Sequence, residues 1–377
     1  MQQKTTHLLI SLLGLSLPLS IYFSNYLFVA AIIVLLFNSP KRKNVRWLAL
    51  FALLVPVLIP LLSIVFHSES VELTDIEVKI PFLITALIIG FKKLNDEILT
   101  RFKYGFVIGS LFASILSLFD NSSFVLFLKS SLFIEFTYTP LYIVISLIYL
   151  WFTDIKIKVS LKIILSVVFL LILFALGNSF FITSGLLIAF AAIIIKGTSS
   201  QSKIAVGVLV LLFSALLYKG AAIQAYLHKA EDDKISGVDK LAQWQCVLEV
   251  MQNNELFGVG YNAKETRLTA CYHEHAMYQA ELNSLNSHNE YLDAFLTLGY
   301  IGVLGLLIYF FKIMFVAYDT KQVAQLLVIV LIALFSISEN VFTRQKGVMI
   351  TVITTLLVFS SKKVKEEGIE NSTAFIK

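Results

Sequence analysis

The sequence predicts an all-α membrane protein that crosses the bilayer many times. The chain is 58% hydrophobic and only 15% charged, with a mean hydropathy of +0.82, whereas roughly a quarter of the residues of a soluble domain are charged. Apolar runs recur along nearly the whole chain. Lys and Arg are concentrated in alternate loops between these runs, which is the distribution that orients helical membrane proteins. We therefore expect a polytopic helical protein with one long outer loop.

The apolar runs give about twelve spans when they are compared with a hydrocarbon core of about 30 Å. The first run has no clear small-x-small cleavage site and further spans follow it, so we expect a retained helix there, not a signal peptide. The polar pair Ser24-Asn25 predicts a break between the first two spans. The expected spans are residues 8–23, 26–38, 47–66, 80–91, 104–119, 137–152, 162–176, 180–195, 204–218, 296–316, 323–337 and 347–360.

The basic residues place both termini in the cytoplasm, because inner loops of helical membrane proteins carry the excess of Lys and Arg. This topology also accounts for the pI of about 8.9 without a nucleic-acid partner. The expected inner positions are Lys41, Arg42, Lys43, Arg46, Lys92, Lys93, Arg101, Lys103, Lys156, Lys158, Lys162, Lys196, Lys203, Lys362, Lys363 and Lys365. The expected division is N-terminal spans in 1–218, an outer loop in 219–295, C-terminal spans in 296–361 and a cytoplasmic tail in 362–377.

The outer loop holds both cysteines of the chain, Cys246 and Cys271. In a bacterium this side of the inner membrane is the compartment in which a disulfide persists. A disulfide between them is one possibility, and two small, half-buried thiols are the other, because sequence does not fix the geometry that a disulfide requires.

The segment DKLAQWQCVLEVMQNN in this loop is predicted to be an amphipathic helix. Its apolar residues recur at the helical period and favour packing against the membrane surface or the top of the bundle. Ser236 or Asp239 is suited to cap its start, and Gly258 and Gly260 indicate a turn beyond its end. The stripe consists of Leu241, Trp244, Val247, Leu248 and Met251.

Lys240 is the unusual residue of this helix. It lies in the expected first turn, where the helix dipole disfavours a cation, and on the same side as Trp244. A bound anion such as a phosphate would account for it. A lysine whose stem packs along Trp244 while its charge reaches water is the alternative.

The stretch SHNEYLDAFLTLGYIGVLGLL joins a polar head to an apolar tail. As one straight helix it would place His288 and Gly299 on one face, with His288 about 16 Å above Gly299 along the axis. Gly299, Gly302 and Gly305 would form a smooth strip for a neighbouring helix. A histidine fixed at the membrane boundary is suited to act as a general base, and a hydrogen-bonded structural histidine is the alternative.

A metal site is a further alternative for the loop. His273 and His275 flank Glu274, and His288 would be a third ligand in a site of three histidines. Nothing in the sequence fixes such a geometry, and we expect no metal.

His288-Asn289, followed by nine residues and Gly299-x-x-Gly302, resembles the motif of the O-antigen ligase family. That family belongs to a superfamily that also contains O-antigen polymerases and protein O-oligosaccharyltransferases. KLAQWQCVLEVMQNNELFGVGY and SENVFTRQKGVM are similar to family segments, so the likeness covers about residues 180 to 350. The chain departs from the family pattern at Gly185, where members often have Arg, at Lys240, where Arg is usual, and at Val303, where ligases favour Gly, Thr or Tyr.

The resemblance implies glycosyl transfer on the outer face of the inner membrane, without nucleotide, metal or other cofactor. The implied donor is a glycan on undecaprenyl diphosphate, and the implied acceptor is a sugar hydroxyl, most simply of lipid A-core. His288 would take the acceptor proton, and Asn289 would orient the histidine or the sugar. The outward-facing cations expected at the diphosphate are Lys240, Arg344, Arg267 and Lys346, with Glu339 expected to pair with Arg344, and with Trp244, Gly299 and Gly302 in support.

Two other functions stay open at this point. An O-antigen polymerase would extend the lipid-linked glycan with similar residues on the same fold. A non-enzymatic transporter of lipid-linked glycan would place more polar residues within its spans, where this chain has few.

Overall fold

The computed structural model describes residues 2–40, 47–68, 77–91, 96–119, 138–153, 155–177 and 240–360, with isolated residues between 122 and 188. In this described part the regular elements are helices and there is no β-strand, so the all-α prediction is confirmed. The count of twelve spans stays a prediction. The expected span 204–218, most of 180–195, the caps Ser236 and Asp239 and the tail 362–377 lie outside the described residues.

Each expected span within the described residues corresponds to a helix. The helices are α1 (Gln2–Leu19), α2 (Ile21–Asn38), α3 (Trp47–His67), α5 (Ile80–Phe91), α6 (Asp96–Ser117), α8 (Thr139–Phe152), α9 (Val159–Ala175), α12 (Lys240–Val250), α13 (Ala263–Glu274), α14 (Tyr278–Leu282), α15 (Glu290–Asp319), α16 (Val323–Phe335) and α17 (Gln345–Ser360).

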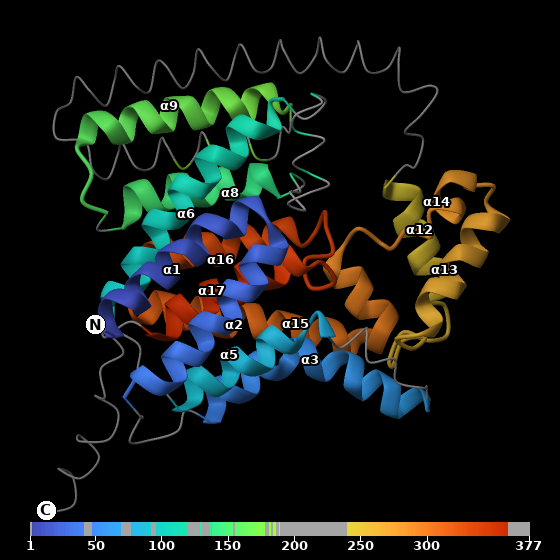
Figure 1. Cartoon of the computed structure of the whole chain (residues 1–377). Coiled ribbons are helices and arrows are strands. Elements are labelled where there is room, and N and C mark those ends of the chain that lie inside the picture. The colour runs from blue at the N-terminus through green and yellow to red at the C-terminus, as the bar shows by residue number, and fades with distance from the viewer. Residues whose placement is uncertain are drawn as a thin grey trace, which may run out of the picture.

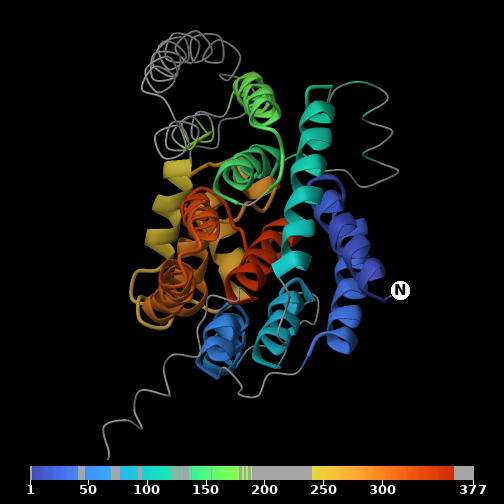
Figure 2. The same ribbon diagram turned by 90° about the vertical axis from the view of Figure 1, so that its left-hand side faces the viewer.

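The helices form an apolar bundle with a smaller polar part at one end. In Figure 1 the long helices run roughly side by side, and α12, α13 and α14 stand apart at the right-hand end. Figure 2, viewed from the left-hand side of Figure 1, shows several of the bundle helices nearly end-on. Two of the described helical segments, Leu99–Ser117 and Glu290–Asp319, are long and apolar enough to cross a membrane, and shorter apolar helices accompany them. This arrangement is consistent with a membrane protein.

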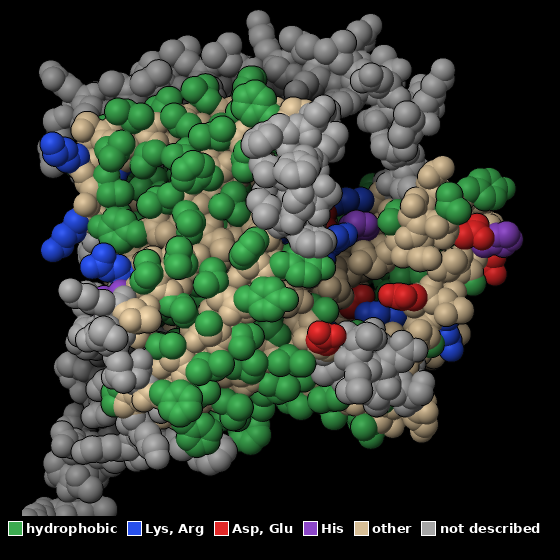
Figure 3. Space-filling model, in the orientation of Figure 1, with side chains coloured by type: hydrophobic (Ala, Val, Ile, Leu, Met, Phe, Trp, Pro, Cys, Tyr) green, Lys and Arg blue, Asp and Glu red, His purple; other side chains and the backbone are tan. Residues whose placement is uncertain are grey.

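The surface of the bundle supports that interpretation. Apolar side chains cover the broad middle of the face shown in Figure 3, and Lys and Arg lie along its left edge. The right edge, which belongs to the α12–α14 part, mixes Lys and Arg with Asp, Glu and His. An apolar belt between two polar ends is the surface that a bilayer requires.

The break between the first two helices lies at Ser20, not at Ser24-Asn25, so the predicted position is wrong. Ser20 has extended dihedral angles (φ −127°, ψ 125°). The Ser24 hydroxyl donates to Ser20 O at 2.7 Å inside the bundle, and Asn25 Oδ1 accepts a hydrogen bond from Gln345. Because the polar pair is satisfied by these partners, the helix continues through it.

Small residues bring α1 and α6 into close contact. A Cβ atom at Gly14 would lie 2.3 Å from Phe102 O, and one at Gly105 would lie 2.0 Å from Ser11 O. Backbones approach in this way where membrane helices pack through glycine and serine instead of large side chains. The first helix is therefore fixed against α6.

The α12–α14 part has its own small apolar core. Helix α12 contributes Cys246 and Val247, α13 contributes Leu268 and Tyr272, and α15 contributes Phe295. Of the predicted stripe of α12, Val247 and Met251 are buried in this core, whereas Leu241 and Leu248 are 63% and 58% exposed. The buried face is rotated toward Gln243, Cys246 and Val247, since the disulfide described below draws Cys246 inward.

Candidate active site

Helix α15 is broken in its upper third, so the straight helix expected from the sequence is wrong. Leu298 (φ −142°, ψ 23°) and Gly299 (φ 62°, ψ −150°) leave the helical conformation. The dihedral angles of Gly299 belong to a region that only glycine enters readily. We call residues 290–297 the upper half of α15 and residues 300–319 its lower half.

A turn of the outer loop fills the break. Val259 N donates to Leu296 O at 2.8 Å, and Tyr300 N donates to Glu255 O at 2.8 Å. These bonds satisfy backbone groups that the break frees on both sides. A Cβ atom at Gly299 would lie 2.4 Å from the Leu256 carbonyl, so glycine is required there for space as well as for dihedral angles. We call the contact of residues 255–259 with residues 296–300 the glycine joint.

The predicted strip of glycines along α15 is wrong for two of its three members. Gly299 belongs to the glycine joint, and a Cβ atom at Gly302 would lie 2.3 Å from Ala294 O of the same helix. Gly302 therefore lets the lower half fold closely against the upper half. Gly305 alone of the three faces another described helix, α3, where its Cβ would lie 3.4 Å from Val55.

His288 lies in the turn that leads into the upper half, with a positive φ of 45°. Its backbone N–H donates to Asn286 Oδ1 at 3.1 Å, and Trp244 Nε1 donates to Ser287 O at 3.1 Å. Positive φ is uncommon outside glycine, and strained residues of this kind are concentrated at functional sites. The surrounding hydrogen bonds hold His288 in this conformation.

Asn289 is the N-cap of α15. Its Oδ1 accepts hydrogen bonds from Tyr291 N at 2.9 Å and Leu292 N at 3.1 Å, as capping side chains do. Asn289 is only 6% exposed. The predicted orienting role of Asn289 stays a prediction.

His288, Glu339 and Lys240 meet from three separate segments. His288 Nδ1 lies 3.4 Å from Glu339 Oε2, and Lys240 Nζ lies 3.8 Å from Glu339 Oε1. Lys240 Nζ also donates to Ser338 O at 2.9 Å. Lys240 and Trp244, one turn apart on α12, thus both face the turn of His288. We call His288, Glu339 and Lys240 the histidine cluster.

The carboxylate of Glu339 is held in its charged form. Burial by itself raises the pKa of this carboxyl, but the hydrogen bond and charge of His288 and the charges of Lys240 and Arg344 outweigh burial and lower the pKa below its ordinary value. Glu339 was expected to pair with Arg344. Within the described residues its ion pairs closer than 4 Å are with Lys240 and His288, and Arg344 acts at longer range.

The other predicted cations occupy different environments. Arg344 is exposed near the histidine cluster, and Arg267 is exposed on α13. Lys346 is only 2% exposed, because its side chain is enclosed by the bundle at the start of α17, so it is not an accessible cation on the surface. Gly185, where the family often has Arg, packs against Leu170 and Leu173.

A buried ion pair that the sequence did not predict lies at the upper half of α15, close to the histidine cluster. Lys264 Nζ lies 2.9 and 2.8 Å from the two carboxylate oxygens of Asp293, and both side chains are 8% exposed. Lys264 Nζ also lies 4.6 Å from the centre of the Tyr261 ring. The signal available in the sequence was Asp293 itself, an acidic residue at the edge of a membrane-grade segment, which calls for a partner.

This ion pair ties α13 to the upper half of α15. Thr297 Oγ1 donates to Asp293 O at 2.7 Å, and Ser63 Oγ of α3 donates to Thr297 O at 2.6 Å. Because the break at Gly299 interrupts the helix below, the Lys264–Asp293 pair and the Ser63 hydrogen bond hold the upper half in place. They fix the scaffold at whose head His288 lies.

Asp293→Asn is expected to lower the free energy of unfolding by about 3–5 kcal/mol, because the buried Lys264 would lose the carboxylate that it contacts. Thermal unfolding of the purified protein in detergent micelles would measure the loss. The control is the double variant Lys264→Met with Asp293→Leu, which removes both charges and should recover much of the stability. An Asp293→Asn variant as stable as the parent would contradict the clamping role.

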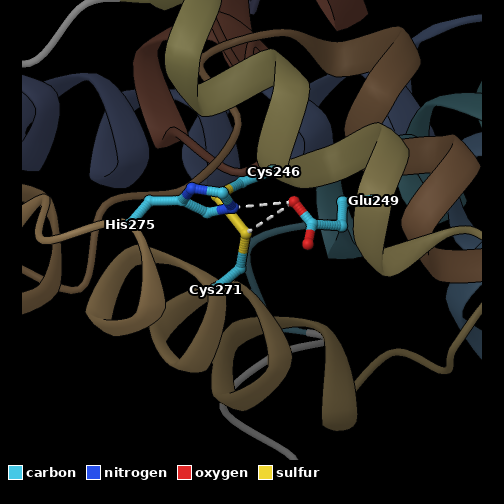
Figure 4. The surroundings of a disulfide bond; sticks show 4 residues. All are labelled: Cys246, Glu249, Cys271 and His275. Atoms are coloured by element: carbon cyan, nitrogen blue, oxygen red, sulfur yellow. Dashed lines mark hydrogen bonds and ion pairs between the residues drawn. A yellow bond between two sulfur atoms is a disulfide. The ribbon is translucent and has the colours of Figure 1, made fainter.

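Cys246 and Cys271 form a disulfide that joins α12 to α13, with their Cα atoms 5.8 Å apart. Figure 4 shows the bond with Glu249 and His275 beside it. His275 Nε2 lies 2.8 Å from Glu249 Oε2. The two sulfur atoms and His275 are close enough together to suggest a metal site, but sulfurs bonded to each other offer no thiolate ligands.

The three histidines of the alternative metal site have separate carboxylate partners. His273 pairs with Glu281 and His275 with Glu249, whereas His288 contacts Glu339. The described residues therefore do not assemble these histidines into one set of ligands.

Reduction of the disulfide is expected to destabilise the α12–α14 part by about 2–5 kcal/mol, because the bond closes a long loop. The midpoint of thermal unfolding, measured with and without reductant, should fall in the parent protein. It should not respond to reductant in a Cys246→Ser, Cys271→Ser double variant, which should already unfold at the lower temperature. Equal midpoints for the parent with and without reductant would oppose this account.

The O-antigen ligase family model matches residues 124–310, about half of the chain. The match includes Lys240, Arg267, His288 and the glycine joint, and it ends before Glu339 and Arg344. It begins nearer the N-terminus than the similarity expected from the motifs and stops short of SENVFTRQKGVM. A comparison with curated proteins finds no match. The resemblance inferred from the sequence is confirmed: the chain belongs to the O-antigen ligase family, which acts in glycan assembly.

Proposed function

We propose that this protein is an O-antigen ligase. In this proposal it transfers a glycan from undecaprenyl diphosphate to a sugar hydroxyl of lipid A-core on the periplasmic face of the bacterial inner membrane. Both termini then lie in the cytoplasm, and α12–α14 lie outside. The observation that carries the proposal is the contact of His288 Nδ1 with Glu339, at 3.4 Å, within a chain of this family.

The contact makes His288 a suitable general base. When Nδ1–H donates to the Glu339 carboxylate, Nε2 carries the lone pair and is available to an acceptor hydroxyl. The negative charge of Glu339 also stabilises the imidazolium that forms when the proton arrives, as a carboxylate does beside a catalytic histidine. His288 is 21% exposed, so a substrate can reach it.

The reaction balances without a nucleotide or a metal ion. The acceptor oxygen forms a bond to the anomeric carbon of the donor as its proton passes to Nε2 of His288. The bond between that carbon and the diphosphate oxygen breaks, and the lipid diphosphate leaves with the electron pair. Lys240 and Arg344 are the cations we assign to the leaving diphosphate, because both contribute positive charge at Glu339 and cations stabilise developing phosphate charge.

Lys240 has a protein partner as well as its proposed ligand. Its contacts with Ser338 O and Glu339 satisfy the cation that the sequence left unexplained. At 49% exposure of the side chain, Lys240 is still accessible to a substrate phosphate. Arg267 is exposed on α13 and is a second-choice contact. Lys346 is buried and is not assigned to the diphosphate.

Glu339→Gln is expected to reduce the transfer rate by about 10- to 100-fold, because Gln keeps the shape but not the charge that stabilises a protonated His288. The variant should also change the pH dependence of stability. The lowered pKa of Glu339 means that its ion pairs stabilise the folded protein at neutral pH, and that this stability is lost as pH falls through the lowered pKa.

The difference in unfolding midpoint between parent and Glu339→Gln should therefore persist from neutral pH down to about 4, and should shrink only below that, as pH falls through the lowered pKa of Glu339. Glu249→Gln is the matched control, because Glu249 contacts His275 instead of His288. The Glu249→Gln variant should have the transfer rate of the parent. A Glu339→Gln enzyme with the parent's rate would remove Glu339 from the proposed mechanism.

An O-antigen polymerase is the competing function, because it uses the same donor and an acceptor that is itself lipid-linked. Expression of this chain in a strain without its own copy separates the two. A ligase restores long polymers on lipid A-core, and in its absence those polymers accumulate on the lipid carrier. A polymerase restores chain length where the core previously carried single repeats. Transport of glycan without covalent transfer would leave both distributions unchanged when His288 is replaced.

A further inference from the structure

The tip of the turn that fills the break in α15 is apolar and exposed. Leu256 is 56% exposed and Phe257 is 43% exposed, although the backbone on either side is fixed in the glycine joint. Gly258 N donates to Asn254 O at 2.8 Å, and Tyr300 N donates to Glu255 O. We call Leu256 and Phe257 the loop tip. Its position is determined by backbone bonds, and about half of each side chain is exposed.

The end of α3 extends the same apolar surface. Val65 and Phe66 are 74% and 57% exposed, and the Phe66 and Phe257 rings have centroids 5.5 Å apart. His67 Nε2 lies 3.3 Å from Gly258 O. Figure 1 shows this end of α3 reaching beneath the segment between α12 and α13. The loop tip and the end of α3 thus form one patch.

The patch continues the outward face of α15, the longest of the described helices. Along the lower half of α15, large apolar side chains recur at steps of three and four residues and are each at least half exposed: Tyr300, Leu304, Ile308, Phe311 and Phe315. That spacing places them on one face. Tyr300 begins this face directly beside the loop tip, since its N–H bonds to Glu255 O.

Lipid is the occupant that such a continuous surface fits. A long apolar helix of a membrane protein with an outward apolar face presents that face to acyl chains. The loop tip is continuous with it, whereas Asn253 and Glu255, the exposed polar neighbours of the tip, suit the headgroup layer. An apolar tip bordered by polar residues is the composition of a segment that enters the interface.

We propose that Leu256 and Phe257, together with Val65 and Phe66, insert into the acyl chains of the membrane leaflet next to the α12–α14 part. The anchor sets the depth of the glycine joint in the membrane. Because the upper half of α15 rises from that joint, the anchor also sets the height at which His288 meets its substrates. This membrane contact does not depend on whether the enzyme is a ligase or a polymerase.

The test is tryptophan fluorescence of the full-length protein in phosphatidylcholine vesicles. Phe257→Trp is the probe, and Leu256→Trp replaces it if the first variant does not fold. Tyr278→Trp on α14, which is 68% exposed and stands at the far end of the molecule from the bundle, is the matched control. The signal of the parent, which has three tryptophans, is subtracted.

We expect brominated acyl chains to quench the tryptophan at 257 several-fold more than the tryptophan at 278, and aqueous iodide to show the reverse order. Quenching at 257 by iodide but not by brominated lipid would overturn the proposal. Shielding from both quenchers would assign the patch to a second copy of the chain or another protein. Quenching by brominated lipid that disappears when the lipid-linked donor is added would assign the patch to the donor's polyprenyl chain. Either of these last results also overturns it.

Discussion

His288→Ala is expected to lower the rate of glycan transfer by about 100- to 10,000-fold, the contribution usual for a positioned general base. His288 Nδ1 contacts Glu339, so Nε2 is the atom that takes the acceptor proton. Alanine has no atom that can replace it. The rate should be measured in vitro with lipid-linked donor and purified acceptor at saturating donor. Binding of donor should change far less than the rate, because the histidine acts on the acceptor proton.

His273→Ala is the control for this variant. His273 also pairs with a carboxylate, Glu281, at 3.0 Å, but its side chain is 70% exposed on the far part of the loop. Its replacement should leave the rate within about two-fold of the parent, as expected of a surface ion pair of little energetic weight. If His288→Ala retained the parent's rate while the protein was folded and present in the membrane, the assignment of His288 as the base would be wrong.

Gly299→Ala is expected to damage the fold severely, for two reasons. The backbone at Gly299 (φ 62°, ψ −150°) costs a non-glycine residue about 1–3 kcal/mol. The new Cβ atom would also lie 2.4 Å from the Leu256 carbonyl, and that backbone is fixed in the glycine joint. The expected result is a strong loss of folded protein in the membrane and, in what remains, of activity, because the joint carries the upper half of α15.

Gly305→Ala is the matched control six residues further along α15. Its Cβ atom would lie 3.4 Å from Val55, an ordinary contact distance, in helical backbone. It should be neutral, or slightly stabilising because alanine favours helix over glycine. Comparison of the unfolding midpoints of the two variants in micelles separates the joint from a general intolerance of α15 to added volume. Equal midpoints would show that the glycine joint does not determine the fold of α15.

The sequence predicted the helices well where apolar runs end at charged or polar residues. The expected span 80–91 coincides with α5, and 47–66 differs from α3 by one residue. Hydropathy succeeds here because a segment in lipid satisfies its own backbone only as a helix. The hydropathy prediction failed at Ser24-Asn25, because these polar side chains form hydrogen bonds inside the bundle and hydropathy does not take such bonds into account.

The site was predictable in part. His288, Lys240, Glu339 and Trp244 were expected to act in one site, and the structure brings their segments together. Lys264 gave no signal, because a lysine in a polar loop is ordinary until its partner Asp293 is known to be buried beside it. The burial of Lys346 depends on how the neighbouring helices pack, and the sequence around Lys346 does not indicate that packing.

The break in α15 was the largest error, and its cause is specific. Gly299 and Gly302 have the spacing of glycines through which membrane helices pack. The same glycines permit a chain to leave the helix. Only the position of Leu256, far away in sequence, decides between the two outcomes. The spacing of the glycines within α15 therefore could not predict whether the helix is straight or broken.

The glycine joint has a consequence for how this family of chains diverges. A Cβ atom at either Gly258 or Gly299 would clash with the backbone beside the other glycine. The two glycine motifs are therefore expected to be retained or replaced together in related sequences. The stretch from His288 to Gly299 is expected to keep its length as well, because one inserted residue would turn the histidine by about 100° around the helix axis. The spacing of the motif thus determines the direction in which the histidine points around the helix axis.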